Sequence, residues 1–380
     1  MKVNNLEKRE YELTCISPVH IGSGETLKSF EYIYNWQKQE VYFVDEARLI
    51  QFLGHRSLMD DFTVFVGEPR NKGLYNWLKS KGCVDRNMLG LSLRRAEVIP
   101  SKDKKLSLNE VHVQAALADG TPYIPGSSIK GALRTGIIYA FLQRKPELKE
   151  VFWRKLETSS HLPIREKKDR WNKALSELEE TLFNHLAVEE KSSNAVNSVM
   201  RGLRISDAQC IGNKPVTVVI PKRDASLNKP IKEHDLSLYR ECLPIGQKLR
   251  FSISVDYSML SKIGISSIDE IIKMSRAYVE FGLNMQKEYF GKQYKAQFDE
   301  AQDIDMLLGG GTGFLAKTVF YALATDYTEA RHMLAKYFDE NISIHKHVVQ
   351  DKLLTPRTLK LTLTNTDKSI MGLCQINEVK

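Results

Sequence analysis

Residues suited to binding an anion are concentrated in the segment PGSSIKGALR. Gly126 predicts a turn, and Ser127 or Ser128 is placed to cap the following helix by accepting a hydrogen bond from a free backbone N–H. Lys130 and Arg134 stand four residues apart, which puts both cations on one face of that helix. Two cations beside a helix N-terminus suit a phosphate group. A capped amphipathic helix with two solvated cations explains the pattern equally well.

A second candidate site is the sequence HIGSGE near the start of the chain. Gly22 and Gly24 bracket Ser23, and because glycine has no Cβ, this backbone can approach a phosphate closely. His20 could stack on a base or act as a general base at a 2′-hydroxyl group. The alternative is a tight turn between two strands with one exposed histidine.

A third candidate is the glycine-rich sequence GGGTGFLAKT in the last third of the chain. Gly311 and Lys317 have the spacing of a phosphate-binding loop, but Ala316 stands where that motif needs glycine, which disfavours nucleotide hydrolysis. A glycine loop lying against RNA fits better, with Gly310, Gly311 and Gly313 in the loop and Lys317 as a phosphate contact. A structural hinge is the alternative.

Charge points in the same direction. The 380 residues include 55 Lys and Arg against 47 Asp and Glu, a net charge of +8, which favours a polyanionic partner. Residues 201–232 hold seven cations beside predicted strands, as a nucleic-acid face would, although a solvated surface is the default for any one of them. These cations are Arg201, Arg204, Lys214, Lys222, Arg223, Lys229 and Lys232.

Other classes of site find little support. The five cysteines form no CxxC pair, which indicates neither a disulfide framework nor a zinc knuckle. His345 and His347 have no third ligand at metal spacing nearby. We therefore predict no metal, no cofactor and no catalytic residue. The polar N-terminus and the short apolar runs predict a cytoplasmic protein without a membrane partner.

The elements that position these residues follow from hydrophobic periodicity. An early strand runs into the first glycine loop, and Asp45 can cap a helix whose Leu49, Ile50 and Leu53 form an apolar stripe that predicts packing inside. The length suggests two domains, and the order of elements fits an α+β fold with helices on one face of a sheet. We expect strands at 11–16, 41–44, 203–211, 216–220, 249–257, 359–364 and 371–376, helices at 147–197, 268–290 and 318–338, and irregular structure at 57–105.

Four motifs together carry a family resemblance: SPVHIGSGE, PGSSIKGALR, GGGTG and MGLCQI. They resemble the RAMP superfamily of CRISPR-associated proteins, and their order and the chain length are most similar to the family of fifth Csm subunits of type III-A effector complexes. The resemblance implies two RRM-like (ferredoxin-like) modules. The first would span 1–245, with a helical insertion at about 147–197, and the second, degenerate module would span 246–380.

The same resemblance implies a role in antiviral and anti-plasmid defence. The chain would cap the far end of the complex, hold the 3′ part of the guide (CRISPR) RNA and contribute to guide maturation without cutting RNA itself. Implied partners are other Csm subunits, especially the backbone RAMP subunit and the small helical subunit, with host nucleases as further candidates. Because RAMP relatives that process guide precursors carry similar loops and a histidine, the alternative is a metal-independent endoribonuclease with His20 as general base.

Overall fold

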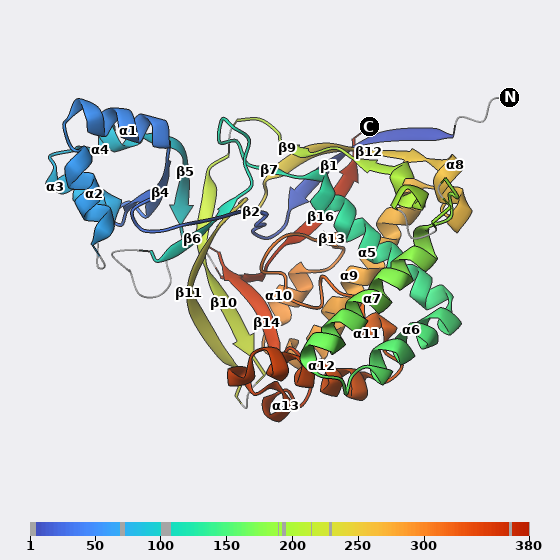
Figure 1. Cartoon of the computed structure of the whole chain (residues 1–380). Coiled ribbons are helices and arrows are strands. Elements are labelled where there is room, and N and C mark those ends of the chain that lie inside the picture. The colour runs from blue at the N-terminus through green and yellow to red at the C-terminus, as the bar shows by residue number, and fades with distance from the viewer. Residues whose placement is uncertain are drawn as a thin grey trace.

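The computed structural model describes residues 5–68, 73–99, 108–188, 190–191, 195–213, 215–227, 230–364 and 367–379. Its strands form two sheets and its helices pack against them, so the α+β prediction is confirmed. In Figure 1 the second sheet, which includes β10 (Thr217–Ser226) and β11 (Lys232–Cys242), stands between a group of short helices from the blue, N-terminal part of the chain and the long helices on the other side.

The first sheet joins the two ends of the chain. Leu13 of its central strand faces Leu249 on one neighbouring strand and Ile376 on the other, both in antiparallel register. Alternate side chains of these strands point into the main hydrophobic core, as the period of a strand requires. The strand order is β13 (Met306–Leu307), β16 (Leu373–Glu378), β1 (Leu6–Cys15), β12 (Lys248–Asp256), β9 (Ala208–Cys210) and β7 (Tyr123–Ile124), with β8 (Leu203–Ile205) also paired to β12.

The second sheet is centred on a long hairpin. A change of register between Pro221 and Lys222 lets this hairpin accommodate a proline, which cannot donate a ladder hydrogen bond. The order is β2 (Gly22–Leu27), β6 (Glu110–Gln114), β11 (Lys232–Cys242), β10 (Thr217–Ser226), β5 (Ser92–Val98), β4 (Glu40–Val44) and β3 (Tyr32–Asn35). A further strand, β14 (Thr358–Leu363), pairs with β10 and with β15 (Lys368–Ile370).

The helices begin and end where local chemistry places their caps. Asp45 accepts a hydrogen bond from Arg48 N–H at the start of α1, as predicted, and Ser267 caps α9 in the same way. The short helices are α1 (Glu46–His55), α2 (Met59–Gly67), α3 (Leu74–Ser80), α4 (Asp85–Gly90), α8 (Tyr257–Leu260), α10 (Lys295–Glu300), α11 (Phe320–Leu323) and α13 (His347–Gln350). The long helices are α5 (Gly126–Arg144), α6 (Pro146–Thr158), α7 (Ile164–Phe183), α9 (Ile268–Phe290) and α12 (Tyr327–Asn341).

Several local predictions differ from the structure. The predicted helical region 147–197 contains α6 and α7, which end at Phe183, and its being an insertion stays a prediction. The described residues between 57 and 99 hold α2, α3, α4 and β5, where irregular structure was predicted. Gly22, Ser23 and Gly24 lie within strand β2, where Gly22 pairs with Gln114 of β6 and the register shifts between Gly22 and Thr26. Neither Ser127 nor Ser128 caps α5, since the helix begins one residue earlier and has no side-chain cap bond.

The division at residue 245 stays a prediction. Strand β1 at the N-terminus pairs with β12 and β16, which both follow that position. In the second sheet, β10 pairs with β14 in the same way. Both sheets therefore draw strands from each side of residue 245.

Helix α5 lies so close to α9 that only glycine fits between them. A Cβ on Gly136 would lie 2.5 Å from Ser275 Cα and 2.9 Å from Met274 O, whereas a Cβ on Gly131 would meet nothing within 4 Å. We expect Gly136→Ala to lower the free energy of unfolding by about 1–3 kcal/mol, because the helices must separate. The matched change Gly131→Ala should raise it by about 0.5–1 kcal/mol. Urea unfolding checks both, and equal effects would contradict this packing.

Candidate nucleic-acid interface

The first glycine segment (residues 20–24) and the second glycine segment (residues 309–318) meet at His20. The N–H of Gly310 donates a hydrogen bond of 2.7 Å to the His20 carbonyl oxygen. Gly309 has φ of +84°, and a Cβ there would clash with the same oxygen. A Cβ on Gly311 would lie 2.5 Å from Met371 Sδ. The glycines of the second segment are therefore needed for contacts within the chain, whereas Gly24 faces open space.

His20 is a buried histidine in its neutral form. Its Nδ1 lies 2.6 Å from the carbonyl oxygen of Glu241. A carbonyl only accepts, so Nδ1 carries the proton and donates it, which leaves Nε2 unprotonated. Burial is the main cause that lowers the pKa of His20 to about 4; the hydrogen bond to Glu241 O opposes this shift, and the charges of Arg240, His112 and Lys317 contribute to it. The prediction of an exposed histidine is wrong, because the side chain is only 4 % exposed.

The lowered pKa of His20 predicts a loss of stability in mild acid. Its ordinary value is 6.5 and its folded value about 4, so between these values protons favour the unfolded chain. Stability is full above pH 6.5 and falls on acidification to about pH 4, with a loss on the order of 3 kcal/mol from this group.

Chemical unfolding between pH 7 and pH 4 measures this dependence. In His20→Asn the amide can still donate to Glu241 O without titrating, so the difference from wild type should shrink as pH falls. The control His161→Asn changes an exposed histidine and should follow the wild type. A constant difference for His20→Asn would contradict a buried, neutral His20.

Four cations surround the second glycine segment, and we call them together the basic face: Lys222, Arg240, Lys317 and Lys360. Ile220 is the register partner of Arg240 and Asp224 that of Lys360, so strands β10, β11 and β14 present three of these cations on one side of the sheet. The fourth, Lys317, comes from the glycine segment opposite.

Contacts at the glycines join the two sides. A Cβ on Gly311 would lie 3.4 Å from Arg240 Nη1, and one on Gly313 would lie 3.2 Å from Lys360 Cγ. The cations also depress one another's pKa. Burial lowers the pKa of Lys222, and the charges of Lys360 and Arg240 add to this effect. The four cations therefore belong to one electrostatic site.

The basic face has little internal neutralisation. Asp224 lies 2.6 Å from Lys360 Nζ and 3.9 Å from Lys222 Nζ. Within the described residues, the side chains of Arg240 and Lys317 make neither a hydrogen bond nor an ion pair. Burial lowers the pKa of Arg240. Lys317 is exposed to solvent, but the protein atoms around it and the charge of Arg240 lower its pKa as well. Since a half-buried cation without a partner is costly, an external anion would stabilise this face.

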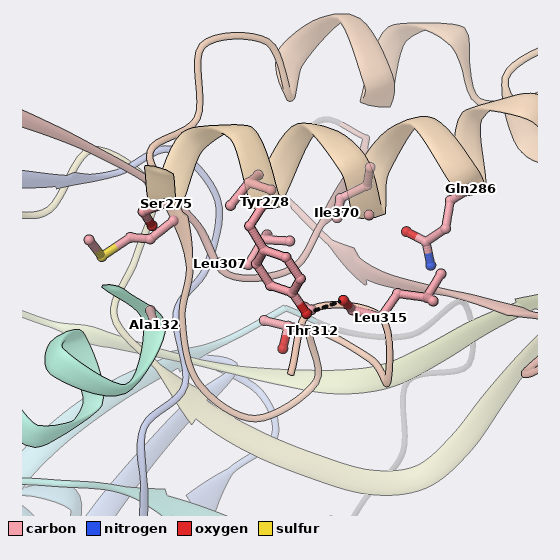
Figure 2. Close-up of a pocket in the computed structure, with 12 residues that line it drawn as sticks. Ala132, Ser275, Tyr278, Gln286, Leu307, Thr312, Leu315 and Ile370 are labelled. Atoms are coloured by element: carbon pink, nitrogen blue, oxygen red, sulfur yellow. Dashed lines mark hydrogen bonds between the residues drawn. The ribbon is translucent and has the colours of Figure 1, made fainter. Parts of the chain in front are cut away.

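The second glycine segment is held rigidly from behind by α9. Figure 2 shows Tyr278 reaching towards the segment, where its hydroxyl lies 2.8 Å from the carbonyl oxygens of Leu315 and Thr318. The Thr312 hydroxyl donates to Gly309 O at 3.1 Å. The cavity between helix and segment is only about 20 Å³, so the backbone has little room to shift. The segment is therefore pre-organised opposite the sheet.

The start of α5 forms a second group, which differs from the predicted open anion site. The N–H of Gly126 donates to the carboxylate of Asp207 at 2.8 Å, so an internal anion already occupies the helix N-terminus. Lys130 Nζ donates to the carbonyl oxygen of Met200 at 2.8 Å, and Arg134 forms an ion pair with Glu179. The sequence could not reveal these partners, because they lie far along the chain.

The remaining predicted residues surround these two groups. Arg201 donates to Val196 O, and Arg204 is exposed and lies near enough to Lys130 to lower its pKa. Gln114 links the groups, since its side chain accepts from Ile21 N–H at 2.8 Å and donates to Tyr123 O, just before α5, at 3.1 Å. Lys214 and Lys229 lie outside the described residues.

Comparison with known proteins identifies the family of this chain. The family model of the RAMP superfamily matches residues 12–315. The chain belongs to the RAMP superfamily. Curated relatives of this RAMP chain are named "CRISPR system Cms protein Csm5". The one from Mycobacterium tuberculosis (strain CDC 1551 / Oshkosh) is 25 % identical and covers 98 % of both chains, and that from Streptococcus thermophilus is 25 % identical over 83 % of this chain and 81 % of its own length.

Solved structures share the fold of this RAMP chain. A chain in "Cryo-EM structure of Csm-crRNA-target RNA ternary complex in type III-A CRISPR-Cas system" matches with a TM-score of 0.67 and 18 % identity, covering 97 % of this chain and 100 % of that one. "Crystal structure of T.onnurineus Csm5" matches with a TM-score of 0.60 and 16 % identity, covering 96 % and 99 %. The resemblance in the four sequence motifs is thereby confirmed.

Other kinds of site find no geometric support in this RAMP chain. Across the described ranges, no group of three or more His, Cys, Asp or Glu side chains could hold a metal ion. The segment at Gly311–Lys317 follows a strand of two residues and precedes a helix of four, which is not the strand–loop–helix of a nucleotide-binding loop. No helix in the described part of the chain has the length and apolar composition needed to cross a membrane.

Proposed function

We propose that this chain is a guide-RNA-holding subunit that caps one end of a type III-A (Csm) effector complex. The observation that carries the proposal is the half-buried Arg240, which has no partner among the described residues and lies beside a rigid glycine segment. The names of the curated relatives and the complex that contains a structural neighbour support the same assignment.

The basic face suits a ligand that must be held whatever its sequence. Lysine and arginine contact phosphates, which carry no base information, so binding should be strong at low salt and nearly independent of sequence. Of the predicted RNA-binding residues, we propose that Lys317 contacts phosphate directly together with Arg240. His20, Gly310, Gly311 and Gly313 give the segment its shape, and Gly22, Ser23 and Gly24 form the exposed edge beside it.

We further propose that the chain contributes to guide maturation and interference in the cytoplasm by holding the 3′ part of the guide RNA. Its partners would be the backbone RAMP subunit, the small helical subunit and host nucleases. A catalytic role for His20 is not favoured, because a general base works best with a pKa near the operating pH. Repeat-containing precursor RNA incubated with the protein in EDTA should remain intact.

Salt-dependent RNA binding tests the proposal. Fluorescence anisotropy with three single-stranded RNAs of equal length and unrelated sequence should give affinities that agree within about threefold. The logarithm of each affinity should fall linearly with the logarithm of salt concentration. Affinities that differ more than about tenfold between sequences, or that do not depend on salt, would contradict phosphate-directed binding.

The start of α5 should matter less for RNA than the basic face. We expect Lys130→Ala with Arg134→Ala to weaken RNA binding only about twofold to fivefold, because both cations already have internal partners. The same double change should lower the free energy of unfolding by about 1–3 kcal/mol, since it removes the half-buried charged hydrogen bond to Met200 O. Anisotropy and urea unfolding check the two effects. A larger loss of RNA binding with unchanged stability would make α5 the principal RNA site.

A further inference from the structure

The second sheet also carries an open apolar groove beside helices α1 and α2. Its volume is about 400 Å³, which lies within the range of binding pockets. Leu27, Phe43 and Phe62 are among its apolar walls. Arg94, at the same groove, donates two hydrogen bonds of 2.8 Å to Glu241. Because Glu241 follows Arg240 on β11, Arg94 and its register partner Phe43 project from the side of the sheet opposite to the basic face, and Val44 and Leu93 complete the groove near the ends of β4 and β5.

The charge of the groove is opposite to that of the basic face. Glu25, Glu31 and Glu46 line it, all three are exposed, and no ion pair within the described residues engages them. Among the described residues that line the groove, Arg94 is the only cation, and Glu241 neutralises it. On a chain with a net charge of +8, this concentration of acids favours a cationic partner and repels RNA phosphates.

The apolar surface continues beyond the groove. Ile50, on its wall, is 57 % exposed although its spacing predicted packing inside, and Val64 on α2 is 65 % exposed. Exposed apolar side chains beside an open apolar groove, with acids at its rim, are typical of protein interaction sites. A ligand that is apolar on one side and cationic on the other would complement this surface.

We propose that this groove binds a cationic amphipathic segment of a protein partner. Apolar side chains of the segment enter the groove between α1 and the sheet, and its lysines or arginines meet Glu25, Glu31 and Glu46. This binding is separate from the RNA-holding role, because the two ligands use opposite faces of one sheet. The chain thereby holds RNA on one face and a basic protein segment on the other.

A synthetic amphipathic peptide tests the groove on the full chain. The probe is a helix of roughly 18 residues with leucine and phenylalanine on one face and lysine on the other, compared with a version that has glutamate for lysine. Fluorescence anisotropy should show binding of the lysine peptide only. Replacing Glu25, Glu31 and Glu46 together with lysine should weaken it about tenfold or more. Hydrogen exchange should show peptide-dependent protection at residues 25–27 and 46–55.

Controls separate the groove from charge in general. Glu147→Lys with Glu166→Lys changes exposed acids elsewhere and should leave peptide binding unchanged. Ile50→Glu, made alone in the wild-type chain, changes an exposed position and should weaken peptide binding. RNA affinity should not change in this variant. The proposal would be overturned if both peptides bound equally or neither bound. It would also be overturned if hydrogen exchange showed protection only outside residues 25–27 and 46–55, or if the two groove variants bound the lysine peptide as well as the wild type.

Discussion

Replacing Arg240 and Lys317 together with alanine is expected to weaken guide-RNA binding about 10- to 100-fold at physiological salt. Both cations face the same glycine segment, and the structure gives neither side chain an ionic or hydrogen-bonding partner in the described residues. Their free energy of binding is therefore available to RNA phosphates. Loss of two phosphate contacts should also reduce the slope of log affinity against log salt by about 1.4. Anisotropy at several salt concentrations measures both quantities.

The matched control removes two exposed lysines elsewhere. Lys262→Ala with Lys273→Ala changes the net charge equally and should leave the slope almost unchanged. Since the Arg240 and Lys317 side chains have no partner among the described residues to lose, and leaving them unpaired is costly, the double variant should unfold at a midpoint no lower than that of the wild type. An unchanged affinity and slope in that folded variant would remove the basic face from the RNA site.

Replacing Glu241 with alanine should cause the largest loss of stability, about 3–5 kcal/mol. The Glu241 side chain is fully buried, and its carboxylate accepts two hydrogen bonds from Arg94, one from Thr217 Oγ1 at 2.8 Å and one from Gln114 N–H at 3.0 Å. Without it, the guanidinium of Arg94 remains buried and unpaired.

Urea unfolding measures the stability lost in Glu241→Ala, and an exposed ion pair of β5, the strand of Arg94, serves as the control. Arg95 binds Glu40 at 3.1 Å, with 44 % of the arginine side chain exposed, so Arg95→Ala should cost at most about 1 kcal/mol. The combined change of Arg94 to methionine and Glu241 to leucine should recover part of the loss, since no unpaired charge is left. A cost below 1 kcal/mol for Glu241→Ala would contradict the role given to this pair.

Local patterns in the sequence predicted what depends on neighbouring residues. Asp45 caps α1 because the cap and the N–H that it accepts from are three positions apart. Periodicity alone predicted the helices α6 and α7. Ile50 shows the limit of such patterns, because the spacing that marks an apolar stripe does not tell whether a partner within the chain covers it.

The candidate site depended on contacts between distant strands. Lys317 and the glycines were predicted, but Arg240 and Lys360 were not, because only the strand register brings them to the same side of the sheet. The interpretation of the glycines also changed. Gly309 and Gly311 leave space for His20 and Met371, whereas the sequence suggested space for a phosphate.

The central claim is that guide RNA lies on the basic face. Photo-crosslinking of the assembled complex, followed by mass spectrometry of the RNA-linked peptides of this chain, tests it most directly. We predict crosslinks in the segment 309–317 and in β11 around Arg240, with none in α1 or α2 beside the acidic groove. Crosslinks confined to α5–α7, or to the groove, would contradict the account.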